Sequence, residues 1–165
     1  MTTCCKRLRA LSLIRPPRRR QRAAASLRLI AVILLAAAQQ AWSATCTVST
    51  PGVNFGSYDV FSNQNLDSTG NISVICDTAV SYTIFLSPGG GSYASRSMAG
   101  GVHRLSYNLY TDPSRTSVWG DGSGGTSIAG GSTIPANHPV YGRIPARQNV
   151  YVGSYSDSIT VTLNF

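Results

Sequence analysis

The stretch GSYSDSITVTLNF, residues 153–165, is the last of the chain and decides the fold. Apolar residues stand at every second position, with polar residues between them: Ile159, Val161, Leu163 and Phe165. A period of two predicts a β-strand with one buried face. Because the sequence stops on the last apolar residue, no later segment can pair with this strand as a hairpin. We therefore expect another segment or another chain to cover its apolar face.

The first 43 residues have the pattern of a signal peptide. Nine basic residues precede an apolar run, LIAVILLAAA at residues 29–38, and the small residues Ala41 and Ser43 follow it. This order is typical of a secretory leader, and the run is short for a membrane span. We expect cleavage before Ala44, which gives a signal peptide at 1–43 and one domain at 44–165. An uncleaved membrane anchor is the alternative; with cleavage, contact with the membrane is limited to the leader.

The predicted cleavage changes the meaning of the net charge. The whole chain has a net charge of +8 and an isoelectric point of about 9.8. The domain at 44–165 keeps five arginines against six aspartates, a net charge of −1, and it has neither glutamate nor lysine. The basic isoelectric point of the whole chain therefore does not indicate a nucleic-acid partner.

Two cysteines, Cys46 and Cys76, remain after the leader is removed. In an exported chain such a pair predicts one disulfide, formed in an oxidising compartment. Closing a loop of this length contributes roughly 3–4 kcal/mol to stability on the chain-entropy model. A metal site is the weaker reading, because the two cysteines lack companions at ligand spacing.

The rest of the domain predicts an all-β structure. All sixteen glycines lie in it, and no stretch has an apolar stripe at helical spacing. Alternating patterns predict strands near residues 45–49 with a continuation at 53–55, and near 70–77, 80–87, 103–111, 116–119, 138–145 and 158–165. Residues 89–101 and 120–132 are expected to be loops. Pro139 and Pro145 place the strand at 138–145 near a sheet edge. This series favours a β-sandwich of immunoglobulin type.

Catalytic chemistry is not expected. The segment GDGSGG, residues 120–125, is one residue out of register with the glycine-flanked serine of serine proteases, and its Asp-Gly pair indicates a turn. A triad also needs a histidine oriented by an acid, and His103 and His138 have no such support in the sequence. With no glutamate, a glycosidase pair is also disfavoured. We predict no enzyme activity, no metal and no cofactor, although a sugar contact by Tyr93, Tyr110 or Trp119 remains open.

Four stretches resemble the spore coat protein U domain family, which is similar to the pilins of archaic chaperone–usher pili. They are CTVSTPGVNFGSYDVFS (46–62), DSTGNISVICD (67–77), LSYNLYTDPSRTSVWGDGSGGT (105–126) and VYGRIPARQNVYVGSYSDSITVTLNF (140–165). The resemblance implies an incomplete immunoglobulin-like sandwich that lacks its final strand. It also implies export through the periplasm to a pilus or coat, with a periplasmic chaperone, an outer-membrane usher and neighbouring subunits as partners.

The resemblance also implies roles for particular residues. Cys46 and Cys76 match the disulfide of the family. The last strand, with Ile159, Val161, Leu163 and Phe165, matches the strand that lines the acceptor groove and pairs with the chaperone, which grips the terminal carboxylate. Burying about four apolar side chains under a donated strand contributes on the order of 6–12 kcal/mol. That is comparable with the whole stability of a domain, about 5–15 kcal/mol. The isolated domain should therefore be marginally stable.

One feature departs from the polymerising pilins. They carry a donor segment before the first cysteine, whereas the predicted cleavage leaves only Ala44 and Thr45 before Cys46. This predicts a subunit that accepts a strand but has little to donate, at a tip or in a coat. The alternatives are a coat or matrix protein that completes its own fold with its N-terminal region, and a small secreted carbohydrate-binding module.

Overall fold

The computed structural model describes residues 43–132 and 134–165. The predicted signal peptide, apart from Ser43, lies outside these residues. The described part, Ser43–Phe165, forms one compact unit built from strands and loops, with no helix among its described residues. Its eight strands are β1 Cys46–Ser49, β2 Leu66–Cys76, β3 Tyr82–Leu86, β4 Arg96–Gly100, β5 His103–Tyr110, β6 Ala129–Gly131, β7 Ala136–Ile144 and β8 Val161–Asn164.

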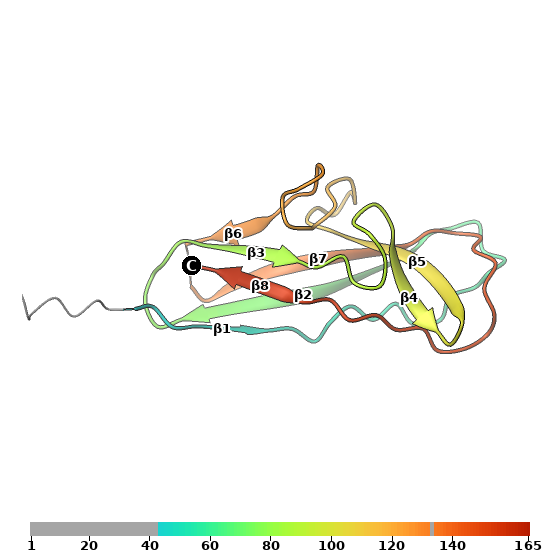
Figure 1. The fold of residues 1–165 in the computed structure, drawn as a ribbon, viewed down its shortest axis with the longest axis horizontal. Helices are drawn as coiled ribbons and strands as arrows, with labels where there is room; N and C mark the ends of the chain where they lie inside the picture. Colours follow the sequence, from blue (N-terminus) through green and yellow to red (C-terminus); the bar gives the residue numbers. More distant parts are fainter. Residues whose placement is uncertain (1–42, 133) are drawn as a thin grey trace, which may run out of the picture. The chain divides into compact units, whose positions relative to one another are not determined.

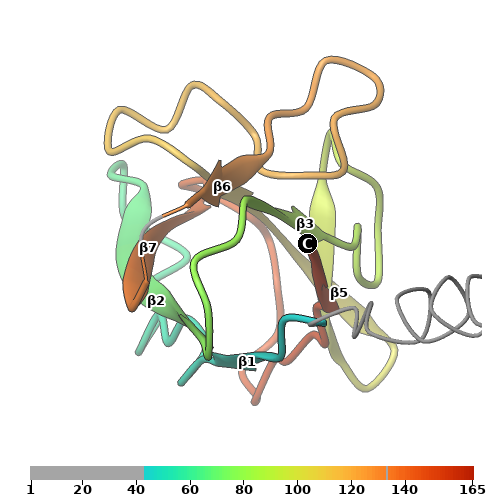
Figure 2. The ribbon, with the colours of Figure 1, turned by 90° about the vertical axis from the view of Figure 1, so that its left-hand side faces the viewer.

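The strands form two antiparallel sheets. The larger has the order β1-β2-β7-β5-β4, and the smaller has the order β6-β3-β8 (Figure 1). In the end-on view of Figure 2, β3 and β6 lie across the interior from β1. Side chains from the inner faces of both sheets form one core, whose most buried apolar members are Ile72, Val74, Ile84, Leu86, Trp119 and Ile144. The predicted all-β sandwich is confirmed, and it is of the immunoglobulin-like class.

The predicted alternation identifies the buried face of the main strands correctly. Ile72, Val74 and Cys76 of β2 are buried, and so are Tyr82, Ile84 and Leu86 of β3 and Leu105, Tyr107 and Leu109 of β5. The predicted disulfide is also confirmed. Cys46 and Cys76 are directly opposite each other in the β1–β2 pair and are bonded, with an S–S distance of 2.06 Å. The disulfide therefore joins the first edge strand to its neighbour.

The prediction of a loop at residues 89–101 is wrong, because this stretch contains β4. Its inward-facing residues are Arg96 and Met98, paired opposite Tyr107 and Leu105 of β5. Arg96 is fully buried, with 0% of its side chain exposed. A charged residue at an inward position removes the apolar alternation by which a strand is recognised in sequence.

The prediction that the strand at residues 138–145 lies near a sheet edge is also wrong. The strand, β7, lies between β2 and β5. It pairs with β2 along its whole length, but with β5 only from Tyr141 to Arg143. Pro139 therefore has a strand neighbour on one side only, and its missing N–H can face the unpaired side without loss of a ladder hydrogen bond.

Three shorter segments also differ from the prediction. The strand expected near 116–119 is reduced to single bridges at Val118 and Trp119, although Trp119 is buried. The loop expected at 120–132 contains the short β6. The last strand, β8, begins at Val161 rather than near residue 158. The alternation nevertheless begins before β8, because Ile159, Val161 and Leu163 are each half-buried between exposed neighbours.

The described part of the chain contains neither a membrane-spanning helix nor a cluster of metal-binding side chains. No helix long and apolar enough to cross a membrane is found there. The same residues contain no cluster of three or more His, Cys, Asp or Glu side chains that could hold a metal ion.

Candidate functional site: an open groove between two strand edges

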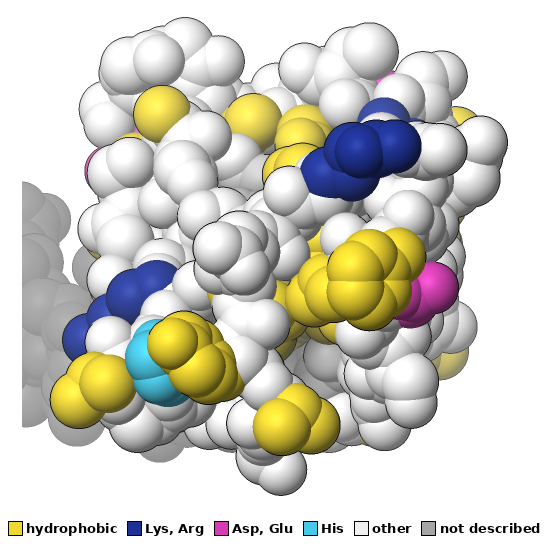
Figure 3. All heavy atoms as spheres, turned by 90° about the vertical axis from the view of Figure 1, so that its right-hand side faces the viewer, with side chains coloured by type: hydrophobic (Ala, Val, Ile, Leu, Met, Phe, Trp, Pro, Cys, Tyr) yellow, Lys and Arg dark blue, Asp and Glu magenta, His cyan; other side chains and the backbone are white. Residues whose placement is uncertain are grey.

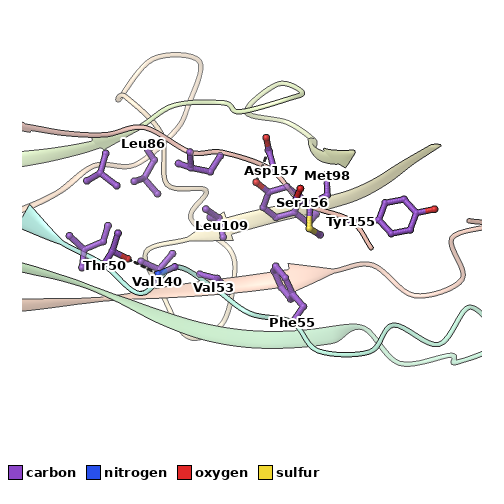
Figure 4. Close-up of a pocket in the computed structure, with 15 residues that line it drawn as sticks. Thr50, Val53, Phe55, Leu86, Met98, Leu109, Val140, Tyr155, Ser156 and Asp157 are labelled. Carbon is purple, nitrogen blue, oxygen red and sulfur yellow. Dashed lines mark hydrogen bonds between the residues drawn. The ribbon is translucent and has the colours of Figure 1, made fainter. Parts of the chain in front are cut away.

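A cavity of about 280 Å³ opens between the chain segment that follows β1 and the segment that leads into β8. We call it the open groove. Its walls are Thr50, Gly52, Val53 and Phe55 on one side and Tyr155, Ser156, Asp157, Ile159 and Val161 on the other, with Ile72, Leu86, Met98, Tyr107, Leu109 and Val140 as the floor. Figure 4 shows Val53 and Phe55 across this space from Ser156 and Asp157. The groove therefore separates the first and last segments of the domain.

The wall after β1 can lie against the inner face of the large sheet because two of its strands carry glycines there. A Cβ atom on Gly142 would stand 2.6 Å from the ring of Phe55. A Cβ atom on Gly70 would stand 2.5 Å from the carbonyl oxygen of Gly52. Phe55 then packs edge-on against Tyr107, with the ring centroids 6.0 Å apart. Glycines at these two positions therefore place one wall of the groove.

The backbone of the same wall is not part of a sheet. From Thr50 to Phe55 it forms no backbone–backbone hydrogen bond with any other described residue. Its local turns are held by side chains: the N–H of Gly52 donates to Thr50 Oγ1 at 3.1 Å, and the N–H of Gly56 donates to Asn54 Oδ1 at 2.9 Å. This wall therefore carries backbone donors and acceptors that an extended strand could pair with.

The opposite wall crosses from one sheet to the other. Ser156 exchanges two backbone hydrogen bonds with Ala99 of β4, at 2.8 and 3.0 Å. Further along, the N–H of Thr160 donates to Ser87 Oγ at 2.9 Å, and the Thr160 carbonyl accepts from the Ser87 N–H at 3.0 Å. Hydrogen-bonding groups of successive strand residues point to opposite sides. The backbone groups of Ile159 and Val161 therefore point away from β3, toward the groove.

Asp157 holds this wall in place. Its Oδ2 accepts from the hydroxyl of Tyr107 at 2.8 Å, and its Oδ1 accepts from the N–H of Gly90 at 3.0 Å and of Ser158 at 2.8 Å. Burial and the nearby Asp157 carboxylate raise the pKa of Tyr107, so this phenol stays a donor at ordinary pH. The carboxylate thereby ties the last segment to β5 and to the turn after β3.

Apolar side chains of the first and last strands are incompletely covered. Val48 of β1 is 37% exposed, although its partner Val74 has the same orientation and is 0% exposed. Of the four residues predicted to line an acceptor groove, Ile159 and Val161 do line the cavity. Leu163 is half-buried against the core outside it, and Phe165 is 56% exposed. The structure brings the first two to the site and places the other two beyond its end.

Sequence reasoning identified one wall of the groove and missed most of the other surfaces. The strand continuation expected at 53–55 contains Val53 and Phe55, but nothing in the pattern shows that they face Ile159 across an opening. Asp157 was not predicted, since a single aspartate before a strand carries no distinctive spacing. Gly70 and Gly142 were a usable signal, because glycine inside a strand often marks a close approach of another backbone.

The groove widens toward the loop end of the sandwich. A larger hollow of about 700 Å³ shares Val53, Phe55, Met98 and Tyr155 with the groove. Large apolar side chains are exposed in the loops here: Phe61 (86%), Val102 (90%), Tyr151 (71%) and Val152 (105%). Figure 3 shows hydrophobic side chains spread over this face, one group beside a histidine. The groove is thus continuous with an apolar loop surface.

The fold and the groove define an immunoglobulin-like sandwich with one open side, and comparison with known proteins identifies its family. The model of the spore coat protein U domain matches residues 32–162, so the chain belongs to that family, as predicted. Protein U of Myxococcus xanthus is 37% identical over 127 residues, which cover 68% of this chain and 71% of that protein.

A similar fold occurs in a crystal structure of the chaperone–tip adhesion subunit pre-assembly complex of archaic chaperone–usher Csu pili from Acinetobacter baumannii. The match has a TM-score of 0.53 and 18% sequence identity, and it covers 74% of this chain. This chain corresponds to 40% of the chain that it matches there. The likeness supports the fold, and the partners named for that complex are its own.

Proposed function

We propose that this protein is a non-enzymatic structural subunit of a chaperone–usher pilus or coat, and that its open groove accepts a β-strand from another chain. The observation that carries the proposal is the pair of facing backbone edges, one at residues 50–55 and one at residues 159–161, separated by an apolar cavity. A strand inserted there can pair with both edges and bury its alternate side chains on the floor between the sheets.

The proposal accounts for the exposed apolar surface along the groove. Ile159 and Val161, which line the groove, are incompletely buried although they belong to inward-facing positions. Covering each such side chain contributes roughly 1.5–3 kcal/mol. The unpaired edges are also potential sites of aggregation until they are covered. A strand from a periplasmic chaperone covers the apolar side chains and pairs with the backbone edges first. A strand from a neighbouring subunit replaces it after passage through an outer-membrane usher.

The position in an assembly follows from the predicted cleavage site. With Ala44 as the first residue, the subunit accepts a strand and has little to donate, which fits a tip or a coat position. In this proposal Ile159 and Val161 contact the middle of the donated strand, and Leu163 and Phe165 contact its end. The proposed location is the cell surface or an extracellular coat.

Co-expression tests the proposal. Exported alone, the protein should be degraded or should aggregate in the periplasm. Exported together with a cognate chaperone, it should be recovered as a soluble one-to-one complex. Ile159→Asp should prevent recovery of the complex, because it places a carboxylate in the groove, whereas Thr160→Asp, on the exposed side, should not. A stable monomer that unfolds cooperatively without a chaperone would contradict the proposal.

A protein that completes its own fold is the second candidate. It is favoured by the packing of Val53 and Phe55 inside the sandwich, since these residues already cover part of the inner face of the large sheet. In that case the groove would remain a solvent-filled cleft in the working protein. The recovery of stable monomer in the experiment above is the result that this candidate predicts.

A further inference from the structure

A tyrosine and a histidine join the two sheets at the end of the sandwich where the chain terminates. Tyr82 is the first residue of β3 in the small sheet, and His138 lies on β7 of the large sheet. The Tyr82 hydroxyl and His138 Nε2 are 2.9 Å apart, which is a hydrogen-bond distance. Figure 1 shows the start of β3 beside the C-terminus. The contact therefore connects two strands that do not pair with each other.

The fold buries this contact and leaves room for it. Tyr82 is 4% exposed, and His138 is half-buried. Gly131 of β6 is paired opposite Tyr82, and a Cβ atom on it would stand 3.1 Å from the Tyr82 hydroxyl. Burial raises the pKa of Tyr82, so the hydroxyl keeps its proton and remains a donor.

The contact depends on the protonation state of His138. A neutral imidazole offers Nε2 as the acceptor for the Tyr82 hydroxyl. A protonated imidazole has a hydrogen on both ring nitrogens, so the hydroxyl loses its acceptor, and a charge is placed where little water reaches it. Burial accordingly lowers the pKa of His138 below its ordinary value.

No carboxylate in the described part of the chain forms an ion pair with His138. Tyr82 is the titratable side chain that faces it from β3, β2 places Ile72 opposite it, and β6 consists of alanine and glycines. The one carboxylate of β2, Asp67, is paired with arginines at the other end of the β2–β7 ladder. The terminal carboxylate of Phe165 follows β8, which pairs with β3 rather than with β7. A charge on His138 is therefore left without a partner.

We propose that Tyr82 and His138 form a pH-sensitive latch between the two sheets, closed at neutral pH and released when His138 is protonated. Histidine is the side chain whose ordinary charge change falls between pH 5 and 8. The pKa of His138 is lower in the folded domain than the unfolded value of about 6.5. The latch therefore stabilises the fold fully above about pH 6.5, and this stabilisation is lost as the pH falls through the lower folded-state pKa.

Release of the latch would loosen the last strand. β8 is the edge strand of the small sheet, and β3 is its strand neighbour. Thr83, next to Tyr82, pairs with Asn164, and at the other end of the same ladder Val161 lines the open groove. Acid would thus weaken the support of one groove wall. The latch belongs to the sandwich itself, so the inference does not depend on whether a strand fills the groove.

Hydrogen exchange read by mass spectrometry tests the latch. The protein is used in the form in which it is recovered after export, alone or with a chaperone, because the peptides of each chain are read separately. Exchange is compared at pH 7.5 and pH 5.5 after correction for the intrinsic rate at each pH. Protection of the peptides that contain β3 and β8 should fall by about threefold to tenfold at pH 5.5, and that of β5 should not.

Three variants assign the effect to its source. His138→Gln keeps an acceptor for the Tyr82 hydroxyl but does not titrate, so its protection should be the same at both pH values. Tyr82→Phe removes the hydroxyl and should show at pH 7.5 the weaker protection that the parent shows at pH 5.5. His103→Gln is the matched control, because the other histidine of the domain stacks on Tyr151 at the start of β5. It should respond to acid as the parent does.

Four results would overturn the inference. They are equal protection of the parent at both pH values, an unchanged acid response in His138→Gln, parental protection of Tyr82→Phe at pH 7.5, and loss of the acid response in His103→Gln.

Discussion

Arg96 is the residue on which the polar interior of the sandwich depends. Its guanidinium donates to the carbonyl of Ser87 at 3.0 Å, to the carbonyl of Trp119 at 2.7 Å and to Asn108 Oδ1 at 2.6 Å. Burial lowers the pKa of Arg96, but an arginine stays protonated in proteins, so it remains a donor. One side chain thereby joins the segment after β3, the strand β5 and the segment around Trp119.

Replacing Arg96 should be strongly destabilising. Arg96→Met leaves the carbonyls of Ser87 and Trp119 without their donor and removes the charged donor to Asn108 Oδ1, which keeps the N–H of Leu109. It should lower the free energy of unfolding by about 3–5 kcal/mol. The measurement is denaturant unfolding of the protein with its groove filled. Arg104→Met, at an exposed position of the neighbouring β5, removes the same charge and should change stability by less than about 0.5 kcal/mol. Similar losses in both variants would contradict the assigned role of Arg96.

Asp67 predicts a dependence of stability on pH. Its hydrogen bond from Arg143, at 2.7 Å to Nε, together with the nearby Arg115, lowers the pKa of this carboxyl below the ordinary value. A lowered pKa in the folded state stabilises the protein above the unfolded-state pKa of about 3.9, and this stabilisation is lost as the pH falls through the lower folded-state pKa.

Asp67→Asn should therefore flatten the acid side of the stability curve. Between about pH 5 and pH 2 the unmodified protein should lose more unfolding free energy than the variant does. The curves should run parallel above this range, where the carboxyl is ionised in both states. A variant with the same acid slope as the parent would show that the ion pairs of Asp67 do not contribute to acid sensitivity.

At the scale of elements, the two walls of the groove are positioned by different devices. The wall at residues 50–55 lies against glycines of β2 and β7, and the wall at residues 155–161 is tied to β4 by Ser156 and to the end of β3 by Thr160. Neither wall pairs with the other. The disulfide between Cys46 and Cys76 joins β2 to β1, the strand from which the first wall continues.

Gly142 offers a test of the first wall. Gly142→Ala would place a methyl group 2.6 Å from the Phe55 ring, and overpacking of this kind costs about 1–3 kcal/mol of stability. The smaller side chain in Phe55→Leu should recover part of the loss when combined with it. Gly153→Ala is the matched control, because a Cβ atom there meets nothing within 4 Å. Denaturant unfolding of the four variants gives the comparison, and equal stability of Gly142→Ala and Gly153→Ala would contradict the packing argument.

Elements with alternating apolar residues could be predicted from sequence, and those without could not. The inward faces of β2, β3 and β5 and the half-buried face around β8 follow the period of two. β4 was missed because Arg96 occupies an inward position, and the central place of β7 was missed because Pro139 looks like an edge residue. The groove itself depends on how β1 and β8 lie across the interior, which local patterns do not encode.

At the scale of the whole molecule, the open groove lies between the first and last segments of the described part of the domain. Its disulfide, its strand order and its incompletely covered apolar side chains are the features on which the proposed strand-accepting function rests. If a strand from another chain fills the groove as proposed, that partner stabilises the folded domain, because a partner that binds the folded state shifts the folding equilibrium.

The predicted leader decides what the subunit can give to a neighbour. Mass spectrometry of the exported protein should show a chain that begins at Ala44 and retains one disulfide. Only two residues would then precede Cys46, too few to fill a groove of this length. A mature chain that begins ten or more residues before Cys46 would contradict this, and would make the protein a donor as well as an acceptor.

The central claim is that a strand from another chain fills the groove, and photo-cross-linking tests it directly. A photoreactive phenylalanine analogue is placed at Val161, which lines the groove, or at Thr162, whose side chain is exposed on the opposite face. In cells that export and assemble the protein, Val161 should cross-link to an extended segment of a second chain, identified by mass spectrometry, and Thr162 should not. Equal cross-linking from both positions, or cross-links from Val161 only within its own chain, would contradict the account.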